Sequence, residues 1–456
     1  MTTMTSIGGR AGTAAAVVLS LTILSGCEVT NPGPIQDEFL ALPASQQGLI
    51  NGAKRAMSEL ISDRSYESAV IAREIFPGGQ TGSSGLNNQL QSGHVKPGSN
   101  NGWTDAVQAR FIAETAIARF TDPELEPAAP GFMVYQAHLW AGYAYRTVGE
   151  WYCEAVIGST DPTDIEPGVH ELNTDTYIAR AISNFTAALG IAGITDDQRY
   201  AALAGRASAY VWAEQWANAA ADAAQVPDDF VFVIEMDDQE SSIYNSLFEA
   251  VGGVFRSYTQ LHTFFDDYYT TTGDPRTPWG PHPDFTTTTA SLQGYANNPV
   301  PFRRQEKYTT QSDDHDLATG WEMRLVQAEA ALAQGDFASA QGLINQVRTR
   351  NIAVNTTGLP TTTAGIVGGS ALAEVTFTNV ADGYTALKRE RYVELWLEGR
   401  RMGDERRWAE NNTPGVIDMP DFESQSTLFT SNPRSTCFDI PDAERESNPN
   451  VPTVTG

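Results

Sequence analysis

The sequence predicts a mainly α-helical fold, in which helical hairpins build a scaffold and long irregular segments are inserted between them. Three observations lead to this prediction. Apolar residues recur at helical spacing in several segments, a hairpin-sized pattern occurs twice, and the stretches between are rich in Pro, Gly and Thr. Because 41% of the 456 residues are hydrophobic, the chain can bury a sizeable core.

The first half of the chain contains a series of separate helices. Each is indicated by apolar residues on one face and is bounded by Pro- or Gly-containing breaks. The predicted helices cover residues 43–61, 103–120, 131–148 and 177–189, and residues 77–102 and 123–130 are predicted to be loops.

An internal repeat follows these helices. In each copy an Ala precedes an aromatic residue by nine positions, and a second Ala follows the aromatic residue three positions later: Ala207, Trp216 and Ala219 in the first copy, Ala328, Phe337 and Ala340 in the second. The pattern resembles a tetratricopeptide helical hairpin, and Gly149–Trp151 is expected to form a similar turn. Two ordinary amphipathic hairpins are the alternative. Since one hairpin cannot bury its apolar face alone, several are expected to stack.

The charge of the chain argues against two kinds of partner, and its motifs favour no enzyme class. A net charge of −27 argues against nucleic acids and against docking on an anionic membrane surface. Nucleophile elbows, Walker loops, HExxH, GxGxxG and EF-hand spacings are absent from the sequence. We therefore expect no catalytic residue, no cofactor and no metal site, and we interpret the acidic clusters at Asp266–Asp267 and Asp313–Asp316 as solvated loops.

The N-terminus resembles the signal peptide of a bacterial lipoprotein. An apolar run from Ala14 to Leu24 is too short to span a membrane, and it ends in Leu-Ser-Gly before Cys27. We interpret residues 1–26 as the signal peptide, Cys27 as the lipidated residue and residues 27–42 as a tether. An ordinary secretory signal with a chance cysteine is the alternative.

Two cysteines remain in the mature chain, Cys153 and Cys437. In an exported protein of this size we expect them to form one disulfide that ties the first half of the chain to the C-terminal tail. Two independent buried thiols are the alternative.

The C-terminal part carries the most specific patterns. Residues 387–408 are predicted to form one amphipathic helix with many Glu and Arg residues, and the tail around Cys437 ends in Asn448-Pro449-Asn450. Together with Asp274-Pro275-Arg276, these segments resemble the SusD/RagB family of nutrient-binding outer-membrane lipoproteins.

The resemblance implies a SusD-like superhelix of tetratricopeptide-like hairpins, with irregular insertions forming the ligand face. It implies no catalysis, but the binding of a glycan or peptide and its delivery to a SusC-like TonB-dependent transporter. It also implies a lipid-anchored protein on the outer membrane that faces the cell surface. The expected single domain covers residues 43–456, with scaffold at about 43–226 and 320–410, insertions at about 227–319 and 352–383, and a tail at 411–456.

A sugar site needs aromatic rings for the apolar faces of pyranoses and polar side chains for the hydroxyls. The loops offer six candidate ligand-binding residues: Trp103, Asn101, Tyr268, Tyr269, Trp279 and Tyr295. Packing within the core or the loops is the alternative role for each. The rival function is a tetratricopeptide scaffold for envelope assembly, which the long irregular chain between the two repeats disfavours.

Overall fold

The computed structural model describes most of the chain after its N-terminal segment. The described residues are 43–78, 86–125, 127–159, 166–253, 257–281, 302–350, 372–420, 423 and 433–453. The predicted signal peptide, Cys27, the tether and Tyr295 lie outside these residues. No helix among the described residues is long and apolar enough to cross a membrane.

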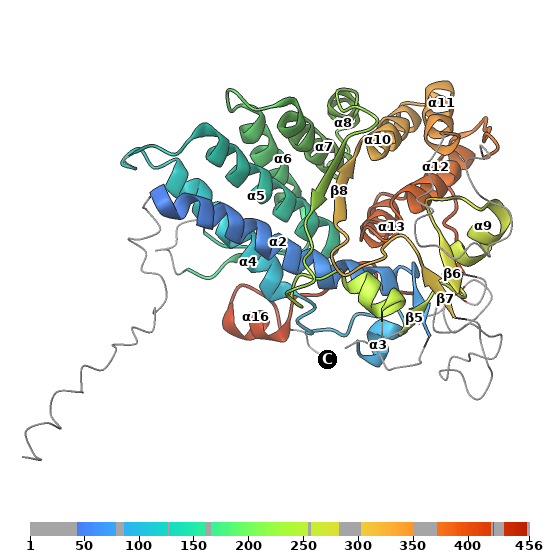
Figure 1. Cartoon of the computed structure of the whole chain (residues 1–456), viewed down its shortest axis with the longest axis horizontal. Helices are drawn as coiled ribbons and strands as arrows, with labels where there is room; N and C mark the ends of the chain where they lie inside the picture. The colour runs from blue at the N-terminus through green and yellow to red at the C-terminus, as the bar shows by residue number, and fades with distance from the viewer. Residues whose placement is uncertain are drawn as a thin grey trace, which may run out of the picture.

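The described chain is mainly α-helical, which confirms the predicted fold class. Helices α4 to α8 and then α10 and α11 follow one another as antiparallel neighbours in a curved row, and α2 packs along α4 and α5 (Figure 1). The helices are α2 (Pro43–Ile71), α3 (Asn88–Gln91), α4 (Trp103–Phe120), α5 (Gly131–Trp151), α6 (Asp175–Leu189), α7 (Asp196–Trp212), α8 (Trp216–Ala223), the π-helix η1 (Phe248–Gly252), α9 (Phe264–Thr272), α10 (Gly320–Ala333), α11 (Phe337–Arg348), α12 (Val380–Glu394), α13 (Arg401–Glu410) and α16 (Asp442–Ser447).

The two copies of the repeat are the hairpins α7–α8 and α10–α11. Both turn through a residue in the left-handed region at the equivalent position, Glu214 with φ 52° and Gly335 with φ 75°. The repeated alanines are fully buried, so the helices of each hairpin approach closely. Helix α10 also packs on α8, which joins the two hairpins into one stack.

The predicted turn at Gly149–Trp151 is wrong, because α5 continues through Trp151. Gly149 serves close helix packing instead. A Cβ atom at this position would lie 2.8 Å from Cδ1 of Ile178 on α6. A glycine inside a helix costs stability, and here its small size lets α5 and α6 touch.

The predicted single helix at 387–408 is also corrected, since it is divided into α12 and α13. Leu397 and Gly399 between them have φ values of 62° and 69°, which a continuing helix does not allow. The break is held from both sides. The Leu397 N–H donates to Glu74 over 2.9 Å, and the Trp151 indole donates to the Gly399 carbonyl over 2.7 Å.

The Glu and Arg residues of this region form buried ion pairs rather than a solvated face. Arg407 bridges Asp404 and Glu329, and Arg400 pairs with Glu150 and Glu322. These pairs connect α13 and the residue before it to α10 and α5, so the charged side chains hold the helices together.

The C-terminal tail is fastened to the end of α5. Cys153 and Cys437, the predicted pair, are joined by a disulfide across a sequence separation of 284 residues. The neighbouring Phe438 exchanges backbone hydrogen bonds with Trp151 and Cys153, and its ring is fully buried. The tail is therefore an integral part of the core.

The β-structure consists of short antiparallel pairs. Most of them lie in the insertion between α8 and α10, at one side of the helical row (Figure 1). The pairs are β1 (Phe76–Pro77) with β5 (Tyr258–Thr259), β2 (Ala155–Ile157) with β3 (Val169–Glu171), β4 (Val231–Ile234) with β8 (His315–Thr319), and β6 (Trp279–Pro281) with β7 (Arg303–Gln305).

Candidate ligand-binding site

Two of the predicted aromatic residues meet in the insertion between α8 and α10. Tyr269 lies on α9 and Trp279 begins β6, and their ring centroids are 5.7 Å apart in an edge-to-face arrangement. Both side chains are half-buried. Each ring is therefore held in place by the other and remains partly exposed. A ring that stacks on a sugar needs both properties.

Charged side chains surround this aromatic pair. The guanidinium of Arg303, from β7, lies 4.5 Å from the centre of the Trp279 ring and forms an ion pair with Asp266. Burial lowers the pKa of Arg303 and raises the pKa of Glu306. Burial, and then the charge of Glu306, raises the pKa of Tyr269. The site offers donors and acceptors beside an apolar ring face.

Gly280 in β6 leaves room for a carboxylate at this site. A Cβ atom on Gly280 would lie 2.3 Å from a carboxylate oxygen of Glu306, so glycine allows that carboxylate to lie against β6. The indole Nε1 of Trp279 has no hydrogen-bond partner within the described residues.

The structure does not support a ligand role for three other candidates. Trp103 is 5% exposed and donates from its indole to Glu444, which anchors the C-terminal tail. Asn101 is 9% exposed, and its carbonyl accepts from the Tyr152 hydroxyl. Tyr268 is buried and donates to Asp274 over 2.7 Å. None of the three presents a free face to solvent.

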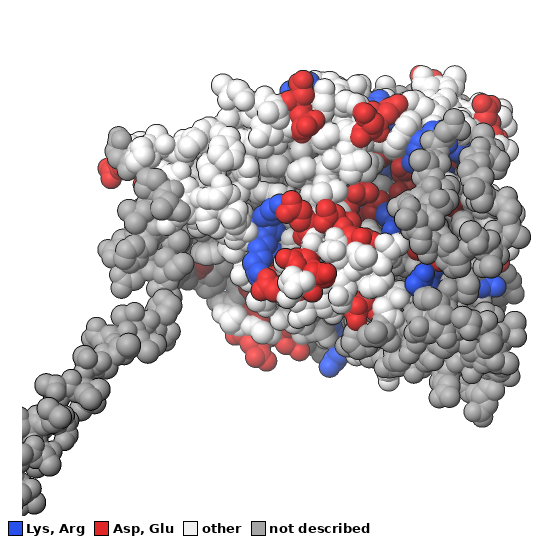
Figure 2. Space-filling view, viewed as in Figure 1, with Lys and Arg blue, Asp and Glu red and all other residues white. Residues whose placement is uncertain are grey.

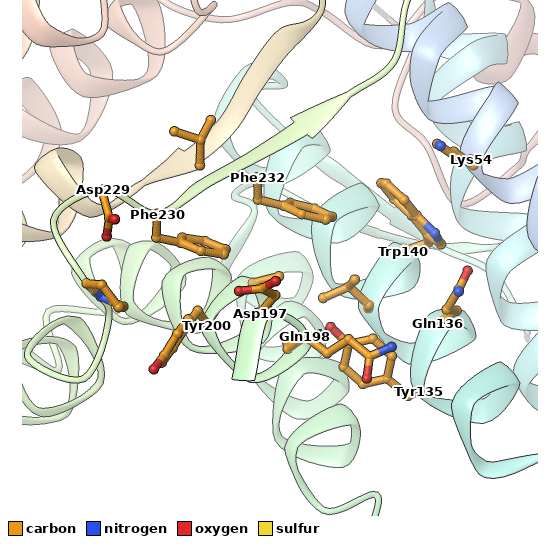
Figure 3. A pocket seen from close by; sticks show the side chains of 14 residues that line it. Lys54, Tyr135, Gln136, Trp140, Asp197, Gln198, Tyr200, Asp229, Phe230 and Phe232 are labelled. Atoms are coloured by element: carbon orange, nitrogen blue, oxygen red, sulfur yellow. Dashed lines mark hydrogen bonds between the residues drawn. The ribbon is translucent and has the colours of Figure 1, made fainter. Parts of the chain in front are cut away.

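A pocket that the sequence reasoning missed lies between α5, α7 and β4 (Figure 3). Its volume is about 700 Å³, within the range of small-molecule sites. Phe230 and Phe232 project from β4 and its start towards the helices, where they face Tyr200 and Trp140. In the sequence, Phe230-Val231-Phe232-Val233 is a continuous apolar run, so the side on which the two Phe rings lie is shown only by the structure, where Val231 is exposed.

Polar groups line the same pocket. Gln136, Asp197, Gln198 and Asp229 contribute side chains, and Lys54 enters from α2 (Figure 3). Lys54 is paired with Glu235 over 2.6 Å. Acidic side chains outnumber basic ones on the described part of the face shown in Figure 2, in keeping with the overall charge.

Comparison with known proteins finds the same architecture in solved structures. Residues 321–451 match the model of the SusD family. A SusD superfamily protein from Bacteroides vulgatus has a TM-score of 0.63 at 13% identity, over 90% of this chain and 98% of its own. The protein has a SusD-like fold. The fold that the resemblance in the sequence implies is thereby confirmed.

Two further SusD-like structures match to a similar extent. A laminarin-binding SusD-like protein gives a TM-score of 0.62 at 15% identity, covering 91% of this chain and 99% of that one. Surface glycan-binding protein A from Bacteroides uniformis gives 0.63 at 14% identity, covering 90% and 99%. No curated protein sequence matches the chain.

Proposed function

We propose that this SusD-like protein binds a nutrient oligosaccharide without catalysis and delivers it to a SusC-like TonB-dependent transporter. The observation that carries the proposal is the pair Tyr269 and Trp279, half-exposed, in contact and flanked by Arg303, Asp266 and Glu306. An aromatic face beside charged hydrogen-bonding groups suits a pyranose ring, whose apolar face stacks while its hydroxyls are bonded.

The comparisons support the class of ligand. Two of the similar structures are described as a laminarin-binding protein and a surface glycan-binding protein. A saccharide is therefore preferred to a peptide as the ligand of this chain. In this proposal Cys27 carries a lipid anchor, and the described domain stands at the outer-membrane surface above the transporter.

Binding is tested on a glycan array, followed by calorimetric titration with the best glycan. Trp279→Ala and Tyr269→Ala should each weaken binding about tenfold, since an aromatic contact contributes up to about 1.5 kcal/mol beyond its area. Phe111→Ala is the matched control, because Phe111 is an exposed aromatic residue on α4, 48% accessible and remote from the insertion in sequence. Unchanged affinity in both site variants, with native melting temperatures, would reject this site.

Anchoring is tested separately by metabolic labelling with palmitate and by fractionation. The wild-type protein should take up the label and sediment with outer membranes, and Cys27→Ser should do neither. A labelled Cys27→Ser protein in the membrane fraction would contradict the proposed anchor.

A further inference from the structure

The pocket between α5, α7 and β4 has walls that are held in place before any ligand arrives. The Phe232 ring lies 5.6 Å from Trp140 and 5.0 Å from Tyr143, and both of these rings are buried. The hydroxyl of Tyr135 donates to the carbonyl of Gln198 over 2.6 Å, which joins α5 to the first turn of α7. A preformed apolar wall loses little conformational entropy when a ligand binds.

The pocket also presents ring faces at an angle to each other. Tyr200 and Phe230 meet edge to face at 5.7 Å, and both are half-buried. Phe232 is half-buried as well, whereas Trp140 is 5% exposed and supports it from behind. The rings thus form an angled apolar surface from β4 towards α7, and the apolar face of a pyranose ring can stack on one of its ring faces.

Hydrogen-bonding groups stand at the rim with unused capacity. Within the described residues, the carboxylates of Asp197 and Asp229 and the amide of Gln136 have no hydrogen-bond or ion-pair partner. Asp197 and Asp229 are exposed and come from different elements, the first turn of α7 and the segment before β4. They can therefore accept from a ligand at two sides of the mouth.

The electrostatics of the rim are negative. Lys54, the basic residue that lines the pocket, is neutralised by Glu235. Arg199 lies against the ring of Tyr200 but pairs with Asp196. The carboxylates of Asp197 and Asp229 remain without a cation, so the mouth attracts ammonium groups and repels carboxylates.

From these walls and this rim we infer that the pocket is a second saccharide-binding site, separate from the insertion. It takes the end of a neutral or amino-sugar oligosaccharide and rejects uronic acids. The ligand class rests on the proposed function, but the location and the charge preference come from the pocket itself. In Figure 1 the helices α5 and α7 stand apart from α9, β6 and β7, so the pocket is distinct from the aromatic pair in the insertion.

The test is calorimetric titration of the full mature protein with three trisaccharide probes: maltotriose, the chitosan trisaccharide with free amines, and trigalacturonic acid. The chitosan trisaccharide should bind most tightly, maltotriose less tightly, and trigalacturonic acid without measurable heat. Phe230→Ala should weaken both binding probes about tenfold. Asp229→Asn together with Asp197→Asn should weaken the chitosan trisaccharide about fivefold and leave maltotriose within twofold.

If Phe230→Ala fails to fold, the double variant Asp197→Asn and Asp229→Asn still tests the pocket. Both aspartates are exposed, so their substitution should leave the fold intact. Phe111→Ala, on the exposed face of α4 and in neither site, is the control and should leave the responses to all three probes unchanged. Probe affinities that respond to Trp279→Ala but to none of the pocket variants overturn the second site and leave the proposed function standing. Trigalacturonic acid bound as tightly as maltotriose overturns the charge argument. Absence of all glycan binding, on the array as well, overturns the proposed function and this inference together.

Discussion

Replacing Arg276 by methionine should destabilise the protein strongly, because this guanidinium holds the insertion between α8 and α10 against helix α12. Arg276 donates to Asp274 over 2.7 and 3.0 Å, to Glu390 over 2.5 Å and to Glu394 over 3.0 Å. The side chains of Arg276 and Asp274 are 5% and 0% exposed. Burial alone would raise the pKa of Asp274, but Arg276 holds it below its ordinary value.

The size of the effect follows from what remains after the substitution. Arg348 still lies 3.3 Å from Glu390, and Arg350 lies 2.8 Å from Glu394. Asp274 keeps only the Tyr268 hydroxyl among its side-chain partners in the described chain. Removing one member of a buried pair costs about 3–5 kcal/mol, so Arg276→Met should lower the free energy of unfolding by that amount.

Urea denaturation followed by tryptophan fluorescence measures the loss. Arg199→Met is the matched control, because its pair with Asp196 is 38% and 78% exposed and should cost less than about 1 kcal/mol. Adding Asp274→Asn to Arg276→Met should restore part of the stability, since it removes the uncompensated charge. An Arg276→Met variant no less stable than the Arg199→Met control would refute the reasoning.

Four other variants test the scaffold by thermal or urea unfolding. The double substitution Cys153→Ser and Cys437→Ser should lower the free energy of unfolding by about 2–5 kcal/mol, because the disulfide closes a long loop. A wild-type protein that is equally stable with and without reductant would contradict this. Glu214→Gly should stabilise the protein by about 0.5–1 kcal/mol, because the left-handed turn at φ 52° favours glycine, whereas Gly335→Ala at the equivalent turn should destabilise it. Burial raises the pKa of Glu74 from 4.5 to about 7, so the folded state retains this proton and stability should fall as pH rises from about 5 to about 7. In the Glu74→Gln variant, the free energy of unfolding should decrease over this pH range by about 3 kcal/mol less than in the wild-type protein. A variant with the same pH profile as the wild-type protein would show that Glu74 does not titrate in this range.

Much of the scaffold could be predicted from the sequence, because helical periodicity and the alanine–aromatic repeat are local signals. The hairpins α7–α8 and α10–α11 occur where the repeat indicates them. The two errors have a tertiary cause. Gly149 resembles a turn residue in sequence, but contact with Ile178 explains it. Leu397 adopts a left-handed conformation that its neighbours Glu74 and Trp151 help to impose, and no local pattern shows such partners.

The candidate site was less predictable, because an aromatic residue in a loop does not reveal which way its ring faces. Trp103 and Trp279 both follow stretches rich in Gly, Asn or Pro, yet Trp103 packs into the core against Tyr152 and Trp279 stays half-exposed. The pocket combines residues from α2, α5, α7 and β4, which are far apart in the sequence. Only the packing of these elements brings Tyr200 and Phe230 together.

The most direct test of the central claim is a pull-down of the tagged protein from detergent-solubilised outer membrane, with mass spectrometry of the recovered proteins. The proposed function predicts a TonB-dependent transporter in stoichiometric amount, retained in the Trp279→Ala variant, whose substitution affects the ligand rather than the partner. Recovery of envelope-assembly or secretion components in place of a transporter would contradict the uptake role and favour a helical-repeat scaffold.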